Sequence, residues 1–161
     1  MKRATLILVI MLFVLSLSAC DGFNNVMCNH LSDAANYHVC QATVQELIPK
    51  EDGRLMIEVI FDNYEDVCGF LGVTPNPNIV VQDYVISLEL TAENAQILTI
   101  NGFLDEIKSG DIIEVRVAKY IYCDTDFFYV AAVSCDGKAY LNFEDGLRNI
   151  IDMMNRNRSF F

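Results

Sequence analysis

Apolar side chains recur at every second position in five separate segments, and this alternation limits the fold more than any other feature of the chain. Successive side chains of a strand point to opposite faces, so such alternation predicts half-buried β-strands. The five segments are residues 42–47, 55–61, 84–90, 113–121 and 128–135. The turn-forming cluster Pro49–Gly53 separates the first two segments, and Asp136-Gly137 terminates the last. The sequence therefore predicts a mainly β domain.

The segments between the predicted strands differ in character. Residues 63–82 hold two prolines, which a central strand does not accommodate, and predict a long loop. Residues 96–100 predict a short extended piece, and residues 103–108 a helical turn. Asn142 is a good helix N-cap and precedes apolar residues at helical spacing, which predicts an amphipathic C-terminal helix. Those apolar residues are Leu147, Ile150, Ile151 and Met154.

The first twenty residues have the layout of a secretory signal. Met1–Arg3 is positively charged, and residues 4–19 form an uncharged, mostly apolar run that ends in the small residues Ser18 and Ala19. The run Leu17-Ser18-Ala19-Cys20 resembles the lipobox of bacterial lipoproteins. The resemblance implies that Cys20 receives a diacylglyceryl group on its sulfur and becomes the new N-terminus. Two acyl chains anchor a protein in the membrane far more firmly than one, because each methylene buried in the bilayer contributes about 0.8 kcal/mol to membrane binding.

Two other interpretations of this leader stay open. Residues 4–20 equal the short limit, roughly 17 residues, of a membrane-spanning helix. Cleavage after Ala19 without lipidation is the third possibility. All three place the later residues outside the cytoplasm, and the lipobox favours a lipid anchor on the extracytoplasmic face of the cell membrane.

The strand order resembles a known fold. Five strands with a helical interruption between the third and the fourth match the order of an OB-fold barrel, although hairpins alone would also suit a sandwich. Ile107–Val115 resembles the segment that leads into the fourth strand of many OB domains. Over residues 40–135 the layout also resembles small uncharacterised bacterial lipoproteins with an OB-like core. This resemblance implies a fold and an envelope location, but no activity.

We therefore expect an all-β chain with minor α content: a five-stranded OB-like barrel with a C-terminal amphipathic helix, after a lipoprotein signal peptide. The expected organisation has four parts. They are the signal peptide at 1–19, a tether and irregular segment at 20–38, the barrel with its helix at 39–155, and a frayed tail at 156–161.

The cysteines allow several arrangements. Of six, lipidation of Cys20 leaves five, an odd number that cannot all pair within one chain. Cys28 and His30 lie close in sequence to His38 and Cys40, and two thiolates with two imidazoles could bind zinc or copper(I). A Cys28–Cys40 disulfide with exposed histidines, or unpaired side chains throughout, are the alternatives.

The net charge of the chain and its lack of known catalytic motifs limit the classes of function that the sequence supports. With 22 acidic and 11 basic side chains the formal charge is -11, which argues against nucleic acid as a partner. The sequence has no nucleophile elbow, no glycine-rich phosphate loop and no His-Glu-x-x-His motif. These features favour a monomeric, non-catalytic binding or accessory module of the envelope. The alternative is a metal-binding or thiol-redox protein that uses the Cys/His group.

Aromatic and acidic residues around the turn between the last two predicted strands form the candidate ligand surface. Rings beside carboxylates can stack on sugars or contact peptide side chains, so the expected partner is an envelope protein, a peptide or a saccharide. The candidate residues are Tyr120, Tyr122, Asp124, Asp126 and Phe127.

Overall fold

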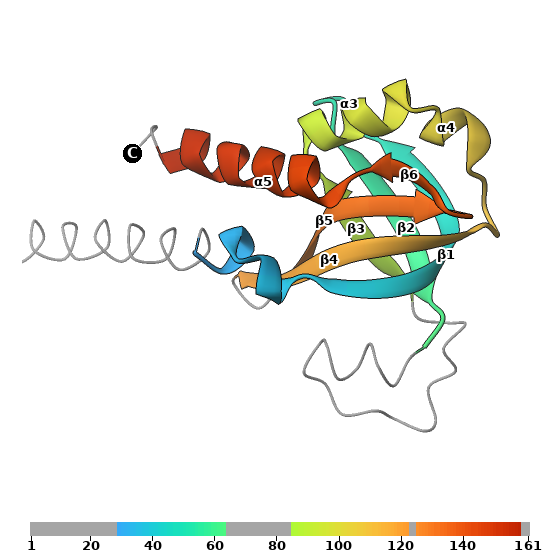
Figure 1. Ribbon diagram of the computed structural model, residues 1–161, viewed down its shortest axis with the longest axis horizontal. Helices are drawn as coiled ribbons and strands as arrows, with labels where there is room; N and C mark the ends of the chain where they lie inside the picture. Colours follow the sequence, from blue (N-terminus) through green and yellow to red (C-terminus); the bar gives the residue numbers. More distant parts are fainter. Residues whose placement is uncertain (1–28, 64–84, 123–124, 159–161) are drawn as a thin grey trace, which may run out of the picture.

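The computed structural model describes residues 29–63, 85–122 and 125–158, and in this part the chain is mostly β (Figure 1). The strands are β1 (His38–Pro49), β2 (Leu55–Phe61), β3 (Ile86–Leu90), β4 (Ile112–Tyr122), β5 (Thr125–Cys135) and β6 (Lys138–Leu141). The helical elements are η1 (Ala34–Asn36), α3 (Ala92–Ile100), α4 (Phe103–Glu106) and α5 (Phe143–Arg158). Residues 29–32 form a further helical turn. The predicted signal peptide and most of the predicted 63–82 loop lie outside the described residues.

Five of the strands close into a barrel. The sheet has the order β3-β2-β1-β4-β5-β6, and β3 also pairs with β5 in parallel, with Glu89 opposite Tyr129. The prediction of a mainly β chain with a five-stranded barrel and a C-terminal helix is confirmed. Among the described residues, no helix is both long and apolar enough to cross a membrane.

The sixth strand, β6, was not predicted. It extends the sheet beyond the barrel as a hairpin with β5. The two residues between these strands, Asp136 and Gly137, have φ of 50° and 79°. Positive φ at both central positions is what a tight hairpin turn with the native strand twist requires. The sequence signal was present in the Asp-Gly pair, but the four residues of β6 are too few to show a clear alternation.

Two elements differ from their predicted form. The predicted extended piece at 96–100 is wrong, because these residues form the second half of helix α3. The Thr91 side-chain hydroxyl accepts a hydrogen bond from the Asn94 N–H and so caps the start of this helix. At the C-terminus, α5 continues to Arg158, so residues 156–158 of the predicted tail are helical.

Apolar side chains pack in two clusters on opposite faces of the barrel wall. The first fills the barrel and includes Ile113, Val115 and Val117 of β4. The second lies outside the wall, where Ala118 and Tyr120 of the same strand are buried with residues of α5 and of the N-terminal segment. The buried members of this second cluster are Leu31, Tyr37, Ala118, Tyr120, Ala131, Ile150 and Met154.

Helix α5 lies very close to β5 at Gly146. A Cβ atom built on Gly146 would lie 2.0 Å from the Ala131 carbonyl oxygen, so no side chain fits there while the backbones keep their positions. The buried Asn94 fastens the same junction. Its Nδ2 donates to the carbonyls of Val130 (3.3 Å) and Gly146 (3.2 Å), and its Oδ1 accepts from the Asn149 amide (2.8 Å). One polar side chain of α3 therefore joins β5 and α5.

Candidate functional site

One of the residues predicted for the candidate ligand surface at the β4–β5 turn, Tyr120, is covered by other elements. Tyr120 is only 8% exposed, because α5 and the N-terminal segment cover that face of β4. Its ring is therefore removed from the candidate ligand surface. Phe127 is half-buried, and the exposed Asp126 forms an ion pair with Lys119 at 3.1 Å. The side chain of Tyr122 and the whole of Asp124 lie outside the described residues.

The three predicted metal ligands that the structure describes lie on two elements. His30 lies in the helical turn at 29–32, with its Nε2 3.0 Å from the Lys119 carbonyl oxygen. His38 is exposed at the start of β1, whereas Cys40 packs partly against the barrel core. Cys28 lies outside the described residues. Among the side chains that the structure describes, no three His, Cys, Asp or Glu residues lie together in a way that could hold a metal ion.

Strand pairing also excludes one disulfide. Cys40 lies on β1 and Cys135 on β5, and β4 runs between these strands. Two strand spacings amount to about 9–10 Å, whereas the Cα atoms of a disulfide lie within about 7 Å of each other. These two cysteines therefore do not pair with each other.

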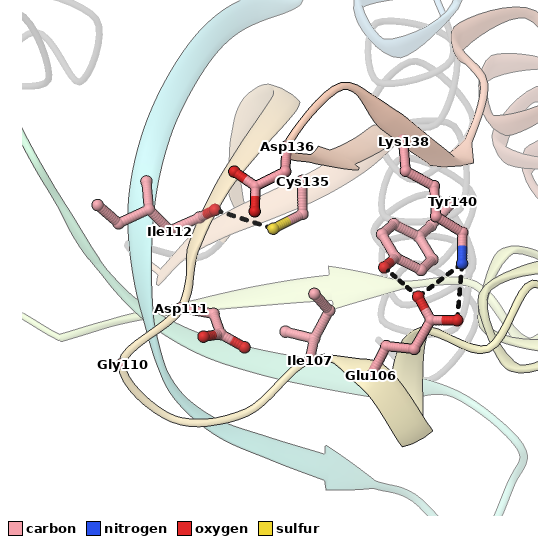
Figure 2. Close-up of a pocket in the computed structure, with 9 residues that line it drawn as sticks. All are labelled: Glu106, Ile107, Gly110, Asp111, Ile112, Cys135, Asp136, Lys138 and Tyr140. Atoms are coloured by element: carbon pink, nitrogen blue, oxygen red, sulfur yellow. Dashed lines mark hydrogen bonds and ion pairs between the residues drawn. The ribbon is translucent and has the colours of Figure 1, made fainter.

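An open cavity of about 630 Å³ lies at the end of the barrel where β4 begins and β5 ends (Figure 2). One wall is the connection from α4 to β4, and the other is the β5–β6 hairpin. Its lining residues are Glu106, Ile107, Gly110, Asp111, Ile112, Cys135, Asp136, Lys138 and Tyr140. This site was not predicted from the sequence, because its two walls come from turns that only the strand register brings face to face.

The α4–β4 wall is fixed to the barrel by backbone hydrogen bonds. The Gly110 N–H donates to the Val44 carbonyl (2.8 Å), and the Val44 N–H donates to the Asp111 carbonyl (2.9 Å). Gly110 has a φ of 95°, which suits glycine and permits this close return to β1. The Asp111 carboxylate also accepts from the Lys108 N–H at 2.8 Å. This wall is therefore preformed.

A hydrogen-bonded network crosses the cavity from one wall to the other. The Glu106 carboxylate accepts from Lys138 Nζ at 2.6 Å and from the Tyr140 hydroxyl at 2.6 Å, as Figure 2 shows. The Lys138 ammonium lies 4.4 Å from the centroid of the Tyr140 ring. The hydrogen bond from Lys138 and, to a smaller extent, the hydrogen bond from Tyr140 lower the pKa of Glu106. The network therefore holds α4 against β6 around an ionised carboxylate.

The phenol of Tyr140 offers a direct test of this network. The hydrogen bond to Glu106 and, to a smaller extent, partial desolvation raise the pKa of Tyr140 to about 12. A raised folded-state pKa means that the neutral phenol is favoured in the native protein, so this contribution to stability is present at neutral pH and is lost as the pH rises through 12. We predict that Glu106→Gln returns this pKa toward 10, so that absorbance at 295 nm shows one more tyrosine ionising near pH 10. The exposed Glu114→Gln should leave the titration unchanged; an unaltered curve for Glu106→Gln would contradict the network.

The cavity has more negative than positive charge. Glu106 is neutralised by Lys138, but the carboxylates of Asp111 and Asp136 have no cationic partner among the described residues. The Cys135 thiol donates a hydrogen bond to the Ile112 carbonyl at 3.3 Å. Desolvation of the thiol and, to a smaller extent, the negative charge of the nearby Asp136 raise the pKa of Cys135. A thiol that stays protonated is a weak nucleophile. The arrangement suits binding of a positively charged group better than covalent chemistry.

Comparison with known proteins gave no relatives for this arrangement. No protein-family model matches the chain, and neither the curated proteins nor the solved structures contain a match.

Proposed function

We propose that this chain is a lipid-anchored, non-catalytic binding module of the cell envelope, built on an OB-like barrel, and that its partner binds in the cavity of Figure 2. The sequence from Met1 to Cys20 supports the location, since it carries a basic start, an apolar run and a lipobox-like end.

Strand order supports the OB-like assignment. The barrel closes in the order β1-β2-β3-β5-β4, with β4 returning to β1, and helices α3 and α4 lie between β3 and β4 in the chain. OB barrels are five-stranded Greek-key barrels that serve as binding modules. The net negative charge of this chain argues against nucleic acid as its partner.

The cavity is the observation that carries the proposed activity. Its volume of about 630 Å³ is within the range of ligand pockets, roughly 300–1,000 Å³. Its lining holds the carboxylates of Asp111 and Asp136, which lack cationic partners among the described residues, and the apolar side chain of Ile112, which is 54% exposed. An open site of this kind fits a peptide segment that presents a lysine or arginine side chain.

Fluorescence anisotropy with short labelled peptides tests this ligand class. We expect a peptide with one lysine or arginine to bind the detergent-solubilised, anchored chain more tightly than its glutamine counterpart. The double variant Asp111→Asn and Asp136→Asn should weaken this binding about fivefold or more, since each partly exposed ion pair contributes up to about 1 kcal/mol. Asparagine at 111 can still accept from the Lys108 N–H.

The double variant Glu51→Gln and Asp152→Asn removes the same charge at exposed positions outside the cavity lining and serves as the matched control. It should bind as the unaltered chain does. Equal binding of basic and neutral peptides, or equal weakening by both double variants, would overturn the proposed site.

A further inference from the structure

We infer that the cavity opens away from the bilayer, so that its partner arrives from the aqueous side and is not a headgroup of the membrane in which the chain is anchored. This inference rests on the lipid anchor at Cys20 that is part of the proposed function.

The point where the tether meets the barrel is fixed. Leu31, in the helical turn at 29–32, is fully buried in the cluster beneath α5, and the Tyr37 hydroxyl donates to its carbonyl at 2.9 Å. His30 Nε2 lies 3.0 Å from the Lys119 carbonyl oxygen. The chain from the anchor therefore joins the barrel beside the last residues of β4.

The cavity lies at the opposite end of the same strand. Ile112, a cavity residue, begins β4, and Tyr122 ends it. At the usual rise, the 11 residues of β4 cover about 33 Å. In Figure 1 the first described residues (blue) lie at the left end of the barrel, and the α4–β4 connection lies at the right end.

The tether is too short to invert the barrel easily. Nine residues, 20–28, can span at most about 30 Å, which is no more than the length of β4. To bring the cavity to the bilayer, the tether would have to run almost fully extended along the whole barrel. The end with Asp126 should therefore lie nearest the membrane.

Energy transfer from the protein to the membrane tests this orientation. The full anchored chain is placed in vesicles of phosphatidylethanolamine and phosphatidylglycerol that carry an acceptor dye on a fraction of their headgroups. A donor dye is attached through an unnatural amino acid at Ser109, beside the cavity, or at Asp126, near the other end of β4; both positions are exposed. With the sites separated by about the length of β4, we expect transfer at position 126 to exceed that at 109 by about twofold or more.

The outcomes separate the inference from the proposal on which it rests. Strong transfer that is equal at the two positions, or stronger at 109, would overturn the orientation and leave the anchor standing. Absence of transfer at both positions would overturn the anchor and the orientation together. A chain with Cys20→Ala, made without its first 19 residues, should lose transfer at both positions and so sets the baseline.

Discussion

Gly146→Ala should destabilise the protein by about 2–3 kcal/mol, the scale of overpacking at a tightly packed site. The added methyl group would meet the Ala131 carbonyl oxygen, which is backbone and cannot move as a side-chain end can. The sign is informative, because alanine in place of glycine within a helix ordinarily stabilises by about 0.5–1 kcal/mol. Urea unfolding followed by circular dichroism measures the difference.

Asp152→Ala provides the control on the same helix. Asp152 is exposed, so its replacement should change the free energy of unfolding by no more than about 0.5 kcal/mol. If Gly146→Ala proves neutral or stabilising while this control behaves as expected, the close contact between α5 and β5 is wrong.

Cys20→Ala should abolish incorporation of labelled fatty acid into the protein. The proposed anchor uses the sulfur of this residue alone, so the loss should be complete. Cells fed a clickable palmitate analogue provide the measurement, read after immunoprecipitation. Cys28→Ala, which removes the next thiol along the chain, should keep the full label. Retained label in the Cys20 variant would place the modification elsewhere.

Much of the barrel could be predicted because its strands bury one face. Leu55, Ile57, Val59 and Phe61 are all buried in β2, and the residues between them are only partly buried, as the alternation predicts. The β1 strand shows the limit of this reasoning. Val44 pairs with Val59 but Glu46 pairs with Glu58, so Gln45 is an extra residue in a bulge. The bulge turns Leu47 toward the barrel core, which alternation from Val44 would not predict.

The candidate site was harder to predict, because burial and proximity there depend on tertiary contacts. Alternation correctly put Tyr120 on the face of its strand opposite Val117, but it could not show that α5 covers that face. The turns that contain Asp111 and Asp136 were each recognisable from their glycine neighbours. Only the pairing of β4 with β5 brings the two turns together, and a single sequence does not contain that register.

Intact mass spectrometry of the chain isolated from its native membranes tests the central claim most directly. We expect a polypeptide that begins at Cys20 and carries the mass of a diacylglyceryl group, with or without a further acyl chain. A product that still begins at Met1, or one that begins at Cys20 with no added lipid, would contradict it.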